Sequence, residues 1–455
     1  MANETIDRRR VRDLRAREDA RFLAERPRSA ALHRAARATM PAGVPMNWMV
    51  SLFDHPPVFV AEGKGAYFTD VDGHRYLDMN LADTSMPLGY GLECIAEAVA
   101  AQMRRGSQFL LPDETGIAVA EELARRFGLP QWQFTLAASS ANTEAIRIAR
   151  AATGREAILM FDGKYHGMLD DTAFELVDGK LRPEGAGLPG DAARRVRIVQ
   201  FNDLDAAEAA LAKGDVACVI TEPALTNIGA ILPQPGFHEG LRALTRRHGS
   251  LLILDEAHTN VCAYGGLTRA WDLDPDFLVL GKAIGGGVAM GAYGMTEDMA
   301  RLLEQGHGGE RRLGAAFGPV AVGGTLFANA LSLAAARVAL EQLLTEEAHG
   351  RAATLGARLA DGIEAAARRH GLPWSGYRLF CRSGYCFAPA PPRNALEARA
   401  AFDLELTNLL RVYFANRGVW EAIYSAGAAV SFAATQDDVD FYLGVLDQAL
   451  GELTA

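Results

Sequence analysis

The sequence predicts an α/β fold, with a large domain built on a mainly parallel central sheet and a smaller α+β domain formed by both chain ends. The main observation is a series of short apolar runs that alternate with helical stretches, which is typical of a sheet covered by helices on both faces. The second is the length, because 455 residues exceed the roughly 150 of a typical domain. We expect the large domain at 76–334 and the small domain at 1–75 and 335–455.

The elements follow in order along the chain. The charged segment 5–38 predicts a helical arm, and the Pro/Gly-rich segment 40–45 predicts a loop. Alternating apolar residues between glycine turns at 58–79 predict a strand meander. The strands of the central sheet are expected at 134–137, 157–161, 195–201, 217–221, 251–255 and 277–281.

The remainder of the small domain is expected after about residue 340. A long helix, strands near 376–387 and a helix at 401–416 precede a last helix, which opens with the capping box Thr435–Asp438. The uncharged run 313–336 is long enough to span a bilayer. Its glycines, proline and polar residues instead predict a buried loop that leads into a core helix.

Composition and charge exclude several classes of function. Hydrophobic residues make up 49% and charged residues 22%, which is typical of a globular protein. A net charge of -10 gives no attraction to nucleic acid or anionic lipid, so we expect neither as a partner. The five cysteines form no CxxC pair, and the charged N-terminus lacks the apolar core of a secretory signal. We therefore expect a cytoplasmic protein without a metal site.

Polar residues follow three neighbouring strands of the predicted sheet. Glu222, Asp255 and Lys282 each come directly after an apolar run, and ligands of parallel sheets bind at this edge. A desolvated lysine suits Schiff-base chemistry with an aldehyde, and an aspartate one strand away suits a pyridinium nitrogen. An acid at the end of a strand, taken alone, more often caps a neighbouring helix than acts in a site. Among the other lysines, only Lys164 competes with Lys282 for this role.

The cofactor that this pair implies also carries a phosphate. A strand, a small-residue turn and a helix at 134–150 would place backbone N–H groups and the positive end of a helix at the turn. Ser139 and Ser140 would add hydroxyl donors. An ordinary helix start has the same pattern, so this signal alone does not establish a phosphate site.

The motifs together resemble one enzyme family. They are GKYHG, TEPALTNIG, LLILDEAHTNV, FLVLGKAIGGGVAMGAYG and GGTLFANAL. In order and spacing they are similar to the class III (glutamate-1-semialdehyde-like) aminotransferases, which are fold type I enzymes that use pyridoxal 5'-phosphate. The resemblance runs from about Ala31 to the C-terminus.

The resemblance assigns a role to each matching residue. Lys282 corresponds to the Schiff-base lysine and proton shuttle, and Asp255 to the partner of the pyridine nitrogen. Tyr165 matches the aromatic residue that stacks on the ring, with His166 supporting it, and Glu222 matches the acid near the floor of the site.

Thr325 matches the phosphate-binding threonine that the family donates from a neighbouring subunit. The resemblance thus implies a homodimer with shared active sites. It also makes the uncharged run 313–336 an interface loop.

The sequence departs from the family pattern at several positions. The phosphate turn lacks one hydroxyl, the glycine and the acid, so contacts through Ala138 and Ser139 would rely on the backbone. Ala257 replaces the usual valine over the ring. His258 stands where glutamine or methionine is common, and it would contact the cofactor's 3-hydroxyl, approach the substrate, or be an ordinary core histidine.

The substrate is less clear from the sequence. The N-terminal loop 41–51 lacks the arginine that often clamps an amino-acid carboxylate, and Asn47 and Trp48 suggest a wall for an aromatic or β-amino acid. Arg378 and Arg382 are alternative partners for a carboxylate.

The leading hypothesis is transamination, in which an amino donor loads the cofactor and a 2-oxo acid accepts the amino group in a ping-pong cycle. An aminomutase or racemase on the same scaffold is the alternative, and the need for a separate acceptor separates the two. A cofactor-binding protein without catalysis is a third reading, which the joint presence of Lys282, Asp255 and Tyr165 disfavours.

Overall fold

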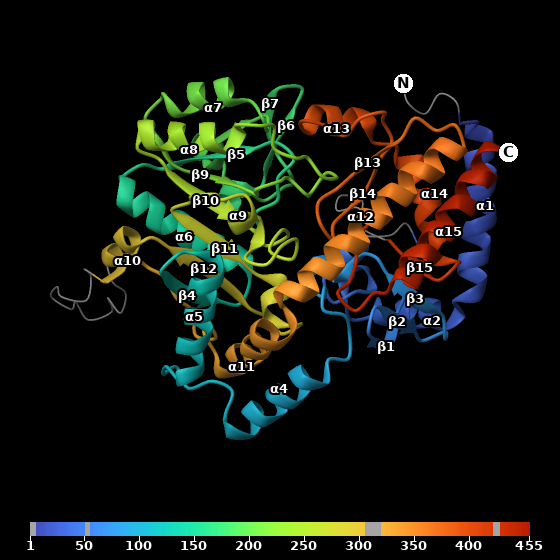
Figure 1. Cartoon of the computed structure of the whole chain (residues 1–455), viewed down its shortest axis with the longest axis horizontal. Coiled ribbons are helices and arrows are strands. Elements are labelled where there is room, and N and C mark those ends of the chain that lie inside the picture. Colours follow the sequence, from blue (N-terminus) through green and yellow to red (C-terminus); the bar gives the residue numbers. More distant parts are fainter. Residues whose placement is uncertain (1–5, 51–54, 305–319, 422–427) are drawn as a thin grey trace.

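The computed structural model describes residues 6–50, 55–304, 320–421 and 428–455. Figure 1 shows two parts: a large sheet layered with helices, and a helical part at which both chain termini lie. The long helix α12 (Glu346–Arg369) extends from the large part along the smaller one. This architecture confirms the predicted fold class. Within the described residues, no helix is both long and apolar enough to cross a membrane.

The central sheet has seven strands, and all neighbours are parallel except that β12 runs antiparallel to β4 and β11. In spatial order the strands are β4 (Gln131–Thr135), β12 (Gly291–Met295), β11 (Phe277–Leu280), β10 (Leu251–Asp255), β9 (Val216–Thr221), β5 (Ala157–Phe161) and β8 (Val196–Val199). The predicted apolar runs therefore become the parallel strands, because a strand buried on both faces needs apolar residues throughout.

Each face of the sheet has its own hydrophobic core, because successive side chains of a strand point to opposite faces. Leu159 and Val219 belong to one cluster, whereas Ile158 and Ile220 belong to the other, which α6 (Ala138–Thr153) covers. The helices that complete the first cluster are α5 (Glu114–Phe127), α7 (Leu204–Leu211), α8 (Phe237–His248) and α11 (Ala330–Val338). The core helix predicted at the end of the uncharged run is α11, while residues 313–319 of that run lie outside the described residues.

Strand β12 is absent from the predicted set because its sequence, GAYGM, contains two glycines, which are unfavourable in strands. A Cβ atom at Gly291 would lie 2.4 Å from the carbonyl carbon of Ala137, and one at Gly294 would lie 2.7 Å from the ring of Trp132. The close approach of β4 therefore requires these glycines. The prediction of a strand at 134–137 is also shifted, because the chain already leaves the sheet after Thr135 to start α6.

The smaller part joins segments from both chain ends. Helix α1 (Arg8–Glu25) packs on α14 (Leu404–Ala415), and α12 packs on α15 (Gln436–Thr454), whose predicted capping box is confirmed. Strand β15 (Val419–Trp420) pairs in parallel with the last strand of the predicted meander, which comprises β1 (Val60–Lys64), β2 (Tyr67–Asp70) and β3 (Arg75–Asp78). The domain boundaries at 75 and 334 stay a prediction.

The predicted helical arm 5–38 is wrong in one respect, because the structure divides it into α1 and α2 (Pro27–Ala36). Pro27 has no N–H to continue α1 but is tolerated in the first turn of α2. Further elements are α3 (Leu81–Thr84), α4 (Glu93–Arg105), α9 (Gly266–Ala270), α10 (Glu297–Glu304), α13 (Ala395–Ala401) and two hairpins, β6 (Phe174–Val177) with β7 (Lys180–Pro183) and β13 (Ser375–Tyr377) with β14 (Gly384–Cys386).

Candidate active site

A cleft of about 1020 Å³ lies at the carboxyl ends of β9, β10 and β11. It is lined by most of the residues that the sequence singles out: Trp48, Ala138, Ser139, Tyr165, His166, Glu222, Asp255, Ala257, His258 and Lys282. Asn47 is exposed, and neither Asn47 nor Thr325 is among the described lining residues. The structure thus brings the predicted cofactor residues together at the expected edge of the sheet.

Lys282 follows β11 after one intervening residue, Gly281, and its backbone lies in the left-handed region at φ +53°. Its Nζ donates to the carboxylate of Asp83 and, at 3.1 Å, to the Asp83 carbonyl, and lies 2.8 Å from Nε2 of His258. The competing Lys164 is buried, with Nζ donating to the Phe174 carbonyl at 2.6 Å and to Glu184. Lys164 therefore has a structural role, and the amine that faces the cleft is that of Lys282.

Asp83 is a site residue that the sequence does not reveal. It lies in α3 (Leu81–Thr84), a turn in which all four non-glycine residues have φ between +46° and +59°. Such residues cost about 1–3 kcal/mol each and persist where the surrounding structure holds them. Burial alone would raise the pKa of Asp83, but His258 and Lys282 outweigh burial and lower it below its ordinary value. The strained turn therefore presents a carboxylate to the lysine.

Asp255 ends β10 and is held in a fixed orientation. Its Oδ2 accepts hydrogen bonds from Asn142 at 2.7 Å and from Nδ1 of His166 at 2.9 Å, and its Oδ1 accepts one from the Ala257 amide at 3.0 Å. Burial would raise the pKa of this carboxyl, but these hydrogen bonds outweigh burial and lower it. Asp255 therefore remains ionised inside the protein, as the partner of a pyridinium nitrogen must.

The polar atoms around Asp255 show that the site can accept a further group. Nε2 of His166 and Oδ1 of Asn142 are buried and have no hydrogen-bond partner among the described residues. Unpaired buried polar atoms are uncommon in native proteins and call for an explanation. A bound polar ligand beside Asp255 would supply one.

The start of α6 has the features of a phosphate cradle. No side chain caps the helix at Ala137, so the first N–H groups and the positive end of the dipole face the cleft. Ser139 packs directly against Gly167, since a Cβ atom at Gly167 would lie 2.2 Å from the Ser139 Oγ. The described residues thus fit pyridoxal 5'-phosphate: an amine for its aldehyde, a carboxylate for its ring nitrogen and a helix start for its phosphate.

A second hydrogen-bonded group lies beside Lys282. The Thr226 hydroxyl contacts the Glu222 carboxyl and lies 2.9 Å from Nδ1 of His258. Burial raises the pKa of Glu222 to about 8, and burial together with the charge of Lys282 lowers the pKa of His258 to about 4. His258 is therefore a neutral imidazole of the active site and not an isolated core histidine. Thr226 was not predicted, although it lies four residues after Glu222 in the same motif.

One part of the cleft lining, contributed by the N-terminal loop, is apolar. Met46 and Trp48 form this part, and Lys282 is the only lysine or arginine among the described lining residues of the cleft. Arg378 pairs with Asp361 and Glu364 instead. Arg382 is buried and donates to the His258 carbonyl at 3.3 Å. Neither of these arginines is a described lining residue, so neither has the position predicted for a carboxylate partner.

Thr325 lies outside the cleft, on an exposed apolar surface. Its carbonyl accepts a hydrogen bond from Gln108, which also holds the amides of Phe109 and Leu110. Phe109, Leu110 and Leu326 are 50%, 71% and 54% exposed. An apolar patch of this kind is typical of an interface.

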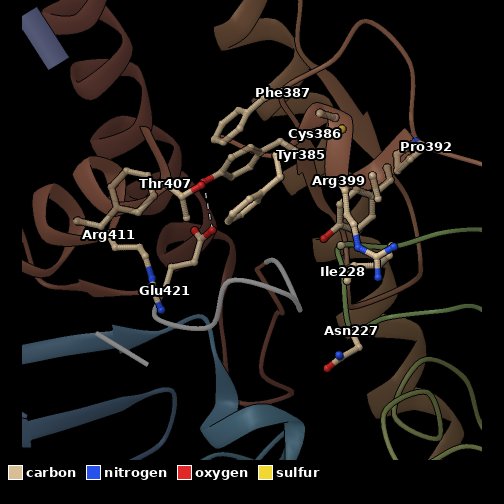
Figure 2. A pocket seen from close by; sticks show the side chains of 17 residues that line it. Asn227, Ile228, Tyr385, Cys386, Phe387, Pro392, Arg399, Thr407, Arg411 and Glu421 are labelled. Carbon is tan, nitrogen blue, oxygen red and sulfur yellow. Dashed lines mark hydrogen bonds between the residues drawn. The ribbon is translucent and has the colours of Figure 1, made fainter. Parts of the chain in front are cut away.

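A second cavity of about 280 Å³ lies between the loop at Asn227 and the smaller part of the molecule, as Figure 2 shows. Tyr385 donates to Glu421 within it at 3.3 Å. None of the residues predicted for catalysis or cofactor binding lines this cavity, but Asn227 lines both cavities. The second cavity therefore adjoins the cleft without being part of the predicted cofactor site.

Comparisons with known proteins agree with this geometry. Residues 51–373 match the family described as aminotransferase class-III. The chain is 35% identical to a glutamate-1-semialdehyde 2,1-aminomutase of Chloroflexus aggregans over 94% of this chain and 98% of that protein. It superposes with a TM-score of 0.93 on a glutamate-1-semialdehyde-aminomutase from Pseudomonas aeruginosa PAO1, at 40% identity over 98% and 99% of the two chains. A lysine-to-alanine variant of that enzyme has been solved in complex with PMP.

A β-phenylalanine aminotransferase from Variovorax paradoxus is also similar, with a TM-score of 0.86 and 28% identity over 97% of each chain. The fold and the cleft thus define a fold type I enzyme that uses pyridoxal 5'-phosphate. The chain belongs to the class III aminotransferase family.

Proposed function

We propose that this chain moves an amino group between neighbouring carbons of one small amino aldehyde, as an aminomutase does. The observation that carries this proposal is the similarity, over nearly the whole length of both chains, to two enzymes named as glutamate-1-semialdehyde aminomutases, at 35% and 40% identity, against 28% for the β-phenylalanine aminotransferase. The described lining of the cleft has no arginine, and no lysine but Lys282, to clamp the second carboxylate of a dicarboxylic 2-oxo acid. The carboxylate of glutamate 1-semialdehyde would lack the same partner, so the lining does not separate the two reactions. The names of the relatives from Chloroflexus and Pseudomonas support the aminomutase reaction.

Transamination of an aromatic or β-amino acid with a 2-oxo acid is the second candidate. Met46 and Trp48, which line the cleft, favour it because they offer an apolar wall for an aromatic ring. The similarity to the β-phenylalanine aminotransferase supports it as well.

In either reaction the side chains have the same proposed roles. Lys282 binds the cofactor and moves protons, and Asp255 holds the ring nitrogen in its protonated form. Ala138 and Ser139 bind the phosphate, while Tyr165 and Ala257 cover the ring, with His166 supporting Asp255. When bound, pyridoxal phosphate supplies an electron sink for the substrate carbon.

The requirement for a second substrate separates the two candidates. Enzyme loaded with pyridoxamine phosphate is mixed with glutamate 1-semialdehyde in the absence of any other amino acid or 2-oxo acid, and the amino ketone formed is measured. We expect many turnovers per active site, because an aminomutase regenerates its own cofactor form. A reaction that stops after one turnover, with the cofactor left as pyridoxal phosphate, and resumes only when an amino-acid donor is added would contradict the aminomutase and establish the transaminase.

We also propose a cytoplasmic homodimer in which Thr325 completes the partner's phosphate site. The exposed apolar surface around Thr325 supports the interface, and the free state of all five cysteines fits a reducing compartment.

Mixing inactive Lys282→Ala and Thr325→Ala subunits is expected to restore activity, since each mixed dimer then holds one intact site. Full activity of a monomer, checked by sedimentation at assay concentration, would contradict the shared site.

A further inference from the structure

A continuous line of hydrogen-bonding atoms leads from the amine of Lys282 into the protein. Nζ lies 2.8 Å from Nε2 of His258, and Nδ1 on the other side of that ring lies 2.9 Å from Oγ1 of Thr226. The same Thr226 hydroxyl contacts Oε2 of Glu222. Glu222, Thr226 and His258 are 2%, 1% and 7% exposed, so these three side chains are almost fully buried, although Glu222 and His258 also border the cleft.

We propose that His258 and Thr226 form a proton relay through which Lys282 exchanges a proton with Glu222. The inference rests on the proposed role of Lys282 as the amine that moves protons. Glu222 then serves as the internal store for the proton that Lys282 gives up before it acts as a base or nucleophile.

The transfer balances atom by atom. Nζ of Lys282 gives a proton to Nε2 of His258 while the Nδ1 proton passes to Oγ1 of Thr226, and the Thr226 hydroxyl proton passes to Oε2 of Glu222. Lys282 changes from ammonium to amine and Glu222 from carboxylate to carboxylic acid. The His258 imidazole and the Thr226 hydroxyl are neutral before and after the transfer. His258 carries its proton on Nδ1 before the transfer and on Nε2 after it.

The charges around the line favour this exchange. Burial keeps His258 neutral, so that one nitrogen donates while the other accepts. Burial and the nearby charge of Asp255 raise the pKa of Glu222, whereas the Thr226 hydrogen bonds and the charge of Arg382 oppose that rise. With its pKa near 8, Glu222 can take up or release a proton close to neutral pH, as a general acid–base group must. The Asp83 carboxylate contacts Nζ of Lys282 and lies 3.4 Å from Nε2 of His258, and so it holds these two nitrogens close together.

Thr226 offers the sharpest test, because valine has almost the same shape without the hydroxyl and serine restores the hydroxyl. Cofactor-free Thr226→Val, Thr226→Ser and wild-type protein are mixed with pyridoxal phosphate, and the visible band of the lysine-bound cofactor is followed by stopped-flow absorbance. Each measurement is repeated over a range of pH and of buffer concentration. Circular dichroism checks that every variant is folded.

We expect Thr226→Val to capture the cofactor about 10- to 100-fold more slowly than wild type. Its rate should rise with buffer concentration, because the Lys282 proton must then leave through solvent. Thr226→Ser should behave like wild type, with no dependence on buffer. Wild-type rates without buffer dependence in Thr226→Val, or equally slow capture by Thr226→Ser, would overturn the relay.

Infrared difference spectra give a second measurement that does not depend on the valine variant. On cofactor capture by wild type near pH 8, a carboxylic-acid C=O band should appear as Glu222 takes up the Lys282 proton, and Glu222→Gln should lack it. An identical band in Glu222→Gln would contradict Glu222 as the acceptor. Both measurements follow cofactor binding and not turnover. They therefore test the relay even if the proposed aminomutase reaction is wrong.

Discussion

Replacing Lys282 with alanine is expected to abolish turnover, with a loss of about 10⁴-fold or more, while the protein remains folded. The side chain supplies the only amine among the described lining residues of the cleft, and it contacts both Asp83 and His258. Its loss removes both the nucleophile that binds the cofactor and the base that moves the substrate proton. Steady-state kinetics and the visible absorbance of the loaded protein measure the two losses.

Lys164→Met is the matched control for this variant. The Lys164 amine is bound to the Phe174 carbonyl and to Glu184, away from the cleft. Its loss should therefore lower the stability and leave the visible band in place. A Lys282→Ala protein that retains both the band and turnover would remove Lys282 from the proposed site.

Asp255→Asn is expected to bind the cofactor and yet react about 10³-fold more slowly. A charge pair at about 4 Å in a medium of effective dielectric near 20 is worth roughly 4 kcal/mol, and a neutral amide cannot replace it. Asn142 donates to one oxygen of Asp255 and the Ala257 amide donates to the other. In the asparagine variant, the NH₂ group would therefore face one of these two donors and lose that hydrogen bond. Single-turnover kinetics, with cofactor content measured by absorbance, test this expectation.

Asn142→Ala separates the charge of Asp255 from its hydrogen bonding. This variant removes the 2.7 Å hydrogen bond but leaves the carboxylate and its contact with His166. We expect a loss of about 10- to 100-fold, in line with the roughly 1.5–3 kcal/mol of a hydrogen bond to a charged group. Equal losses in the two variants would mean that orientation, rather than charge, is what Asp255 contributes.

The parallel strands and the residues at their ends could be predicted because their physical signals are local. Strands such as β9 and β10 are buried on both faces and so appear as unbroken apolar runs. Once the sheet is parallel, Glu222, Asp255 and Lys282 must share one edge. Strand β12 could not be found in this way, because its glycines reflect the close approach of β4, a segment far away in the sequence.

Asp83 and Thr226 escaped prediction for a related reason. The backbone of Asp83 is left-handed only because the folded site holds it there, and no glycine or asparagine marks the turn. Thr226 is an ordinary threonine until the loop after β9 places its hydroxyl between Glu222 and His258. The sequence leaves the role of His258 open between cofactor contact, substrate contact and core packing, because its neighbours come together only in the folded chain.

Reduction of the loaded protein with borohydride, followed by tryptic peptide mapping, tests the central claim most directly. The reagent fixes the cofactor to the lysine that holds it, and trypsin does not cut at a modified lysine. We predict that the label lies on the peptide 270–301, left uncut at Lys282. A label on the peptide that contains Lys164, or a loaded protein in which no lysine is labelled, would contradict the assignment of Lys282 as the cofactor-binding residue.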